Sequence, residues 1–252
     1  MSVDACAALV ARGDPDRFLA VMAAPVAVRA RLFPLYAWNL EVARAPWVTA
    51  EPLIAQMRLQ WWRDVVAGAD ARAHEVAGPL WRVIREAGLP VGVMDRLIEA
   101  RRWDIGREAF VDQTAMDAYL EETGGGLMWL ACVAAGAEAG EAAARDIGWA
   151  AGLAAFLRAA PDLAARGRVP LVDDDPGAIR ALAEAGLTRL RRGRAGIAGL
   201  GAGRVATLAG WQAGAILGRV AAHPEWVSGG GLGLSEFGRR GRLVWASLRG
   251  RP

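Results

Sequence analysis

The residues of this chain that could carry chemistry are carboxylates. Asp104 and Glu108 stand four positions apart, and on a helix this spacing would place both carboxylates on one face. Mg²⁺ prefers oxygen ligands and often binds one or two carboxylates together with substrate phosphates. A single pair of this kind more often marks a solvated helix surface. Glu41 is a lone acid in an apolar stretch, and we interpret it as the partner of Arg44 or Arg63 in an ion pair.

Composition excludes several other kinds of active site. The sequence has two histidines and two cysteines, and none of them is spaced to form a zinc cluster or a histidine-based triad. It has no lysine, which excludes a lysine Schiff base and a P-loop. All 30 basic residues are therefore arginines, but the net charge is only +3 and no motif indicates nucleic-acid binding. We expect neither a bound metal nor a nucleic-acid partner.

Helices are the elements that must position these residues. Hydrophobic residues make up 54% of the chain, and many of them are alanine, a strong helix former. We expect one all-α domain over residues 1–252, in which 232–252 form a basic C-terminal helical tail. No uncharged apolar run reaches the roughly 18 residues that a transmembrane helix needs. The start of the chain lacks a basic segment before an apolar one, so we predict neither a membrane span nor a secretory signal.

Two predicted helical stretches, residues 34–44 and 57–64, place large aromatic residues beside isolated polar ones. Asn39 is the single asparagine of the chain, and an amide on an apolar helix needs hydrogen-bond partners. We expect five of the tryptophans to be core residues, namely Trp38, Trp61, Trp62, Trp103 and Trp129. A further helix contains three consecutive glycines at 124–126. Each glycine costs a helix about 1 kcal/mol relative to alanine, so this triplet predicts a kink or the close approach of another segment.

Five segments resemble, in order, the squalene/phytoene synthase family. They are residues 35–38, 57–64, 103–105, 116–126 and 152–171. Each is a weak signal alone, but together they cover roughly residues 15 to 175. The resemblance implies an isoprenoid-synthase-like all-α bundle enclosing an apolar tunnel. In working members of the family, two aspartate-rich motifs hold magnesium and a prenyl diphosphate.

In this chain, the positions of both aspartate-rich motifs hold other residues. The replaced positions are Ala43, Arg44, Trp47, Ala159 and Leu163. Only Asp162 remains near the second motif. Without these carboxylates, a synthase lacks the ions that neutralise the diphosphate and assist its departure. The resemblance therefore implies a non-catalytic protein with no cofactor, and Mg²⁺ is expected only if the protein is an enzyme after all.

Residues 37–43 and 56–63 resemble a divergent branch of the family, the phytoene-synthase-like assembly factor for respiratory complex I. Residues carried over from that branch are Asn39, Glu41, Gln60 and Arg63. This resemblance implies an assembly or scaffolding factor with a protein partner at the membrane. Such a protein would be cytoplasmic, and peripheral at the inner membrane.

Two alternatives stay open. The first is a prenyltransferase that condenses prenyl diphosphates, with Glu41, Asp104, Glu108 and Asp162 as improvised magnesium ligands. The second binds a lipid or a prenyl diphosphate, with the guanidinium groups of Arg58, Arg63 and Arg168 in place of magnesium. The candidate cavity or ligand-binding residues are Tyr36, Asn39, Glu41, Arg58, Gln60, Arg63, Asp104, Glu108, Asp162 and Arg168. The catalytic residues, if any exist, stay unknown.

Overall fold

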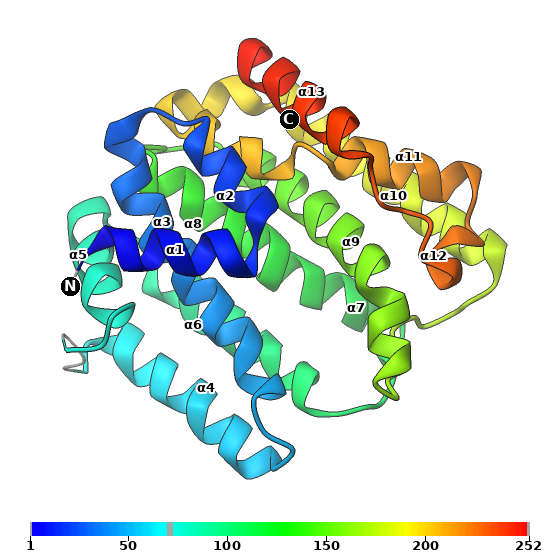
Figure 1. Ribbon diagram of the computed structural model, residues 1–252, viewed down its shortest axis with the longest axis horizontal. Helices are drawn as coiled ribbons and strands as arrows, with labels where there is room; N and C mark the ends of the chain where they lie inside the picture. Colours follow the sequence, from blue (N-terminus) through cyan, green and yellow to red (C-terminus); the bar gives the residue numbers. More distant parts are fainter. Residues whose placement is uncertain (1, 70–72, 251–252) are drawn as a thin grey trace.

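The computed structural model describes residues 2–69 and 73–250, and these residues form helices with no β-strand. The α-helices are α1 (Val3–Gly13), α2 (Pro15–Met22), α3 (Val26–Arg44), α4 (Pro52–Ala67), α5 (Ala77–Ala87), α6 (Val91–Ala100), α7 (Gln113–Leu120), α8 (Gly126–Ala134), α9 (Glu141–Ala165), α10 (Pro176–Ala195), α11 (Ala213–Ala222), α12 (Trp226–Gly229) and α13 (Glu236–Arg249). The 3₁₀ and π segments are η1 (Ala45–Trp47), η2 (Arg101–Ile105), η3 (Glu121–Gly125) and η4 (Ile197–Gly210). The predicted all-α fold is confirmed (Figure 1).

Aspartate followed by proline starts two of the helices. The Asp14 carboxylate accepts a hydrogen bond from the backbone N–H of Arg17 at 2.9 Å, and α2 begins at Pro15. Asp175 caps α10 in the same way, because its carboxylate oxygen accepts from the N–H of Gly177 at 2.7 Å. These caps satisfy N–H groups that have no partner inside the helix.

Helix α3 contains the predicted helical stretch of residues 34–44 and extends it back to Val26. It runs through Pro34 without ending, and residues 32–39 are all buried. Neighbours α1, α2, α5 and α8 pack around it. Burial on all sides compensates for the backbone hydrogen bond that a proline removes. Trp38 is completely buried, and Tyr36 and Asn39 are nearly so.

The glycine triplet allows two backbones to touch. Residues 121–125 form a π-helical turn between α7 and α8, and this turn packs on α9. A Cβ atom on Gly124 would lie 2.6 Å from the carbonyl oxygen of Gly148, closer than real contacts allow. The predicted close approach is therefore confirmed, and the approaching segment is α9.

Helix α4 turns a row of large apolar residues toward solvent. Leu53, Met57 and Trp61 are 68%, 63% and 39% exposed, whereas Leu59 and Trp62 are buried. The helix has apolar residues on two faces, and only one face packs against the body of the protein. The prediction that Trp61 is a core residue is therefore wrong. It is confirmed for Trp38, Trp62 and Trp129.

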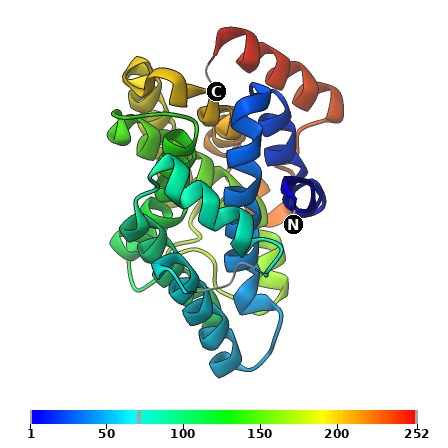
Figure 2. The ribbon, with the colours of Figure 1, turned by 90° about the vertical axis from the view of Figure 1, so that its left-hand side faces the viewer.

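The C-terminal helix lies at the end of the molecule opposite α4, as both ribbon views show (Figures 1 and 2). Ser235 caps this helix, α13, and its hydroxyl accepts from the N–H of Gly238 at 3.2 Å. The helix packs through Ala246 on a small apolar cluster with Ala20, Leu208 and Trp211, separate from the main core. No helix in the described part of the chain is long and apolar enough to cross a membrane.

Candidate functional site

A cavity of about 340 Å³ lies in the centre of the bundle, bounded by residues of α2, α3, α7, α9 and α11. Four positions that the resemblance assigns to aspartates line it. Ala43 and Trp47 come from the first motif, and Ala159 and Leu163 come from the second. Arg44, the remaining replaced position, is exposed and does not line the cavity. The chain thus keeps the space between the two motif regions without their carboxylates.

Asp104 is the one predicted acid that lines this cavity, and its carboxylate is already paired. It accepts hydrogen bonds at 3.1 Å from the guanidinium of Arg101 and at 3.1 Å from the hydroxyl of Tyr119. Arg101 also donates to the Tyr119 oxygen at 2.6 Å. Burial opposes the charge of Arg101, but Tyr119 and Asp104 outweigh it and raise its pKa. Burial also raises the pKa of Tyr119. The three groups form a closed hydrogen-bonded cluster.

The predicted pairing of Asp104 with Glu108 on one helix face is wrong. Helix α6 ends at Ala100, and a short 3₁₀ turn carries Asp104. Gly106 then adopts an extended conformation. Glu108 is consequently exposed, and its carboxylate accepts from the backbone N–H of Arg107 at 3.0 Å. The i,i+4 rule fails here because the helix does not extend to residue 108.

Two further acids line the cavity, and sequence reasoning missed both as site residues. Asp16 pairs with Arg158 at 3.2 Å and with Arg239 of α13. Burial alone would raise the pKa of Asp16, but hydrogen bonds from Gln212 and Arg239 and the charges of Arg239 and Arg158 lower it. Asp14, which caps α2, is also in an ion pair. The Asp–Pro–Asp segment starts a helix, but no local pattern in the sequence indicates that it faces a cavity.

The donor set of the cavity does not fit the magnesium ions of the family's synthases. Each of the three carboxylates has an arginine partner. The pairs are Asp14 with Arg17, Asp16 with Arg158, and Asp104 with Arg101. A magnesium ion would have to displace these guanidinium groups, although it prefers free carboxylate oxygens. Among residues 2–69 and 73–250, no three Asp, Glu, His or Cys side chains form a group that could hold a metal ion.

The cavity presents hydrogen-bond acceptors that lack partners. Asn39 and Gln212 both line it, and the side-chain oxygen of each is buried with no hydrogen-bond partner among the described residues. An unpaired buried polar atom costs roughly 1–3 kcal/mol. A ligand that donates hydrogen bonds would remove this cost. The retained Asn39 therefore belongs to the cavity wall and is not a satisfied core amide.

Trp47 changes the surroundings of one first-motif position from acidic to aromatic. Its ring lies over the guanidinium of Arg168, with 4.5 Å between the ring centroid and Cζ. Trp103 covers the same guanidinium at 5.2 Å, and its ring stacks on Phe110 at 3.9 Å. Arg168 is buried and donates to the backbone carbonyl of Asp104. Burial lowers the pKa of Arg168. The side chain packs behind Trp47 and does not line the cavity.

Two of the candidates, Glu41 and Arg58, line a different hollow. This pocket of about 230 Å³ lies beside α4 and is completed by Trp61, Trp62 and His74. Asp162 is exposed on α9 and lies outside both pockets. The acids of the prenyltransferase alternative are therefore scattered and surround no common space.

Arg63 is engaged on the surface of the α4–α6 contact. Its guanidinium pairs with Asp95 at 2.6 Å and with Glu99 at 2.9 Å. The expected ion pair of Arg63 with Glu41 is wrong, because Arg63 faces α6. Gln60 donates to Asp64 at 2.9 Å on the same helix. Of the ten candidate site residues, the structure gathers Tyr36, Asn39 and Asp104 around the central cavity.

The sequence profile of squalene/phytoene synthase matches residues 10–175. The chain belongs to the squalene/phytoene synthase family. Its fold resembles the crystal structure of a dehydrosqualene synthase in complex with ligand, with a TM-score of 0.73 and 11% identity over 98% of this chain and 95% of that one. A squalene synthase from Alicyclobacillus acidocaldarius gives a TM-score of 0.60 and 18% identity over 99% and 95% of the two chains. At these identities the likeness shows the isoprenoid-synthase fold alone.

Within the family, the chain is similar to proteins named NADH dehydrogenase (ubiquinone) complex I, assembly factor 6. It is 30% identical to the Bos taurus protein and 28% identical to the Homo sapiens protein over 174 residues, which are 67% of this chain and 52% of each relative. The homologue from Drosophila melanogaster is 31% identical over 181 residues, a match that covers 66% of this chain and 53% of that homologue. The predicted resemblance to this branch is confirmed. The chain spans about half the length of these relatives.

Proposed function

We propose that this chain is a non-catalytic family member that helps to assemble a respiratory NADH dehydrogenase of the complex I type. The observation that carries the proposal is the central cavity. It keeps its place between the two motif regions, yet every carboxylate in its wall is neutralised by an arginine. The process in this proposal, assembly of complex I, comes from the names of the similar relatives. We expect the protein to act in the cytoplasm, peripherally at the inner membrane.

Helix α4 provides a surface for the protein partner that this function requires. Leu53, Ile54, Met57 and Trp61 are exposed along it. Large exposed apolar patches of this kind mark sites of protein–protein contact. The same helix carries residues 56–63, the segment that resembles the assembly factors. We infer that the partner binds α4 and reaches the adjacent pocket with Glu41 and Arg58.

Gene deletion in the source organism tests the assembly role. We expect loss of the assembled complex on native gels and a matching loss of NADH:quinone oxidoreductase activity, both restored by the wild-type gene. Met57→Asp should fail to restore assembly, whereas Gln56→Asp on a neighbouring exposed face should succeed. Normal assembly in the deletion strain would refute the proposal. Equal failure of both variants would refute the role of the α4 face.

A second candidate function is the binding of a neutral isoprenoid lipid, and the unpartnered acceptors of Asn39 and Gln212 favour it. The terminal hydroxyl of the lipid could donate to one of these oxygens while its isoprenoid tail occupies the apolar part of the cavity. We expect farnesol to bind without Mg²⁺, and Asn39→Ala to weaken binding about tenfold, the value of one buried hydrogen bond. Magnesium-dependent binding of farnesyl diphosphate in place of farnesol would contradict this candidate.

A further inference from the structure

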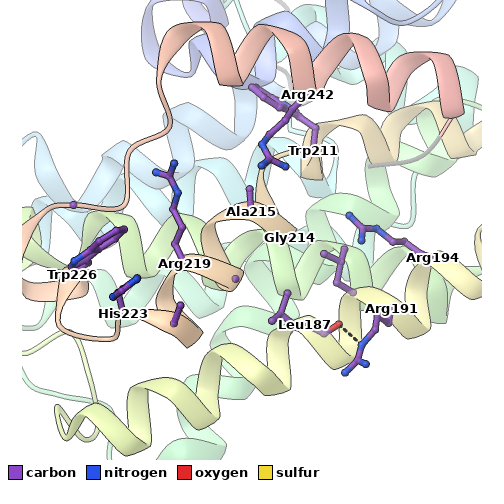
Figure 3. A pocket seen from close by; sticks show the side chains of 14 residues that line it. Leu187, Arg191, Arg194, Trp211, Gly214, Ala215, Arg219, His223, Trp226 and Arg242 are labelled. Carbon is purple, nitrogen blue, oxygen red and sulfur yellow. Dashed lines mark hydrogen bonds between the residues drawn. The ribbon is translucent and has the colours of Figure 1, made fainter.

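A groove of about 1090 Å³ opens on the outer surface between α10, α11 and α13 (Figure 3). Four arginines line it from these three helices. Arg191 and Arg194 belong to α10, Arg219 to α11 and Arg242 to α13. Trp226 closes one end and stacks on His223 with 4.3 Å between ring centroids. The floor between them is formed by small and apolar residues of α10 and α11.

No acidic residue is among the described residues that line this groove. Arg219 donates to the backbone carbonyl of Gly233 at 2.6 Å, and Arg191 donates to the hydroxyl of Thr188 at 3.0 Å. Those acceptors are neutral. Among the described residues, Arg191, Arg219 and Arg242 form no ion pair with a carboxylate. Guanidinium groups bind phosphate in a bidentate manner, so the groove fits a phosphate-bearing ligand.

Helix α13 borders the groove and presents an apolar face to solvent. Phe237, Val244 and Leu248 are 89%, 59% and 78% exposed, and Trp245 beside them is 57% exposed. Spacings of seven and four residues place the first three on one side of the helix. Ala246, on another side, packs against the protein. Large apolar side chains are therefore directed away from the core along the whole helix.

Arginines flank this apolar face on both sides. Arg240 stands on one flank, and Arg242 and Arg249 stand on the other, as the helical period of 100° per residue requires. The guanidinium of Arg249 lies 4.2 Å from the ring centroid of Trp245. An apolar face with tryptophan at its edge and arginines beside it is typical of helices that lie in the surface of a membrane. Arg242 belongs to both features, which makes the groove and the helix one continuous surface.

We propose that α13 and the arginine groove form a docking face for an anionic phospholipid membrane. Phe237, Val244 and Leu248 enter the boundary between headgroups and acyl chains, and Arg219 and Arg242 bind lipid phosphates. Charge complementarity and the flanked apolar face together favour a lipid surface over an acidic protein. Docking in this way directs α4, at the opposite end of the molecule, away from the membrane (Figures 1 and 2). The inference adds an orientation to the proposed function and stands without it.

Vesicle co-sedimentation with the purified full chain tests the proposal. We expect binding to vesicles that contain phosphatidylglycerol, weak binding to pure phosphatidylcholine, and a decline with added salt. Arg219→Ala/Arg242→Ala should weaken binding about thirtyfold, from about fivefold for each arginine near an anionic surface. Arg12→Ala/Arg85→Ala changes the net charge equally on α1 and α5 and should leave binding unchanged.

The apolar part of the face has its own test. Phe237→Ala/Leu248→Ala keeps every arginine, and we expect it to remove the binding that persists at high salt. All these side chains are exposed or line the groove, so thermal unfolding should confirm that each variant folds. Equal binding to both vesicle types, or equal weakening by the control pair, would overturn the proposal. Stabilisation of the protein against thermal unfolding by inorganic phosphate or by an acidic polypeptide, together with no binding to vesicles, would overturn the proposal too. None of these results depends on complex I assembly.

Discussion

The central cavity and the outer groove both contain arginines, but the two regions use them in opposite ways. In the cavity, arginine neutralises an acid in every case, as Arg101 does for Asp104 and Arg158 does for Asp16. In the groove, the lining has arginines and no acid. The difference indicates that the charges of the cavity are paired with one another in this chain. On the outside, Arg191, Arg219 and Arg242 form no ion pair with any residue in the described part of the chain.

Burial explains why the two regions must differ. A buried ion needs a partner, since leaving it alone in the interior costs several kcal/mol. When the aspartate-rich motifs are replaced, the remaining cavity acids can persist only beside arginines. Exposed arginines carry no such penalty because water solvates them. The groove can therefore keep its charge available for an external anion.

Removal of one cavity acid should have the largest effect on stability. Asp104→Ala leaves Arg101 without its carboxylate in a nearly closed environment. We expect the free energy of unfolding to fall by about 3–5 kcal/mol, as measured by urea denaturation. Asp162→Ala, at an exposed acid on α9, serves as the control and should change it by less than about 0.5 kcal/mol. A loss below about 1 kcal/mol for Asp104→Ala would show that the cluster is not closed.

The second largest difference is expected between two glycine-to-alanine substitutions, one in the lining of the cavity and one in the lining of the groove. Gly124 lines the cavity, where a new Cβ would collide with the Gly148 carbonyl, so Gly124→Ala should cost about 1–3 kcal/mol. Gly218 lines the groove and has open space around it. Gly218→Ala should stabilise α11 by up to about 1 kcal/mol. Thermal unfolding of both variants checks the difference, and equal destabilisation would contradict it.

Acidification should loosen the attachment of α13 to the cavity wall. Asp16 pairs there with Arg239, and its pKa is lowered in the folded protein. This contribution to stability is complete above the unfolded pKa of about 3.9, and it is lost as the pH falls through the lower folded value. Urea denaturation from pH 6 down to pH 2 should show a decline that Asp16→Asn reduces. An identical decline in the variant would assign the pH dependence to other acids.

The smallest effect is expected for an arginine of the groove. Arg242 is exposed and forms no ion pair among the described residues. Arg242→Ala should therefore change the free energy of unfolding by no more than about 0.5 kcal/mol. Urea denaturation in parallel with Asp104→Ala provides the measurement. A loss comparable to that of Asp104→Ala would mean that Arg242 stabilises the fold and is not available for an anion.

Features set by neighbouring residues could be predicted from the sequence. Asp14 with Pro15 starts α2, Asp175 with Pro176 starts α10, and the glycines at 124–126 meet another backbone. Each depends on local hydrogen bonding or on the size of one side chain. The four replaced motif positions that line the cavity were likewise found from the order of motifs along the chain.

Features set by residues far apart in the sequence could not be predicted in this way. Asp16 and Arg239 are 223 positions apart, and no pattern near either residue announces their ion pair. Periodicity showed that α4 has an apolar stripe but could not decide which face the rest of the chain would cover. The pairing of Asp104 with Glu108 failed because a 3₁₀ turn and an extended Gly106 interrupt the expected helix. Tertiary packing decides all three cases.

Turnover of prenyl diphosphates most directly tests the claim that the cavity carboxylates are neutralised and cannot bind magnesium. The purified chain would be incubated with farnesyl or geranylgeranyl diphosphate and Mg²⁺, with an authentic dehydrosqualene synthase as the positive control. Because all three cavity carboxylates are held by arginines, we predict no release of diphosphate and no magnesium-dependent binding. Release of diphosphate that requires Mg²⁺ and is lost in Asp104→Asn would contradict the account and establish the chain as an active synthase.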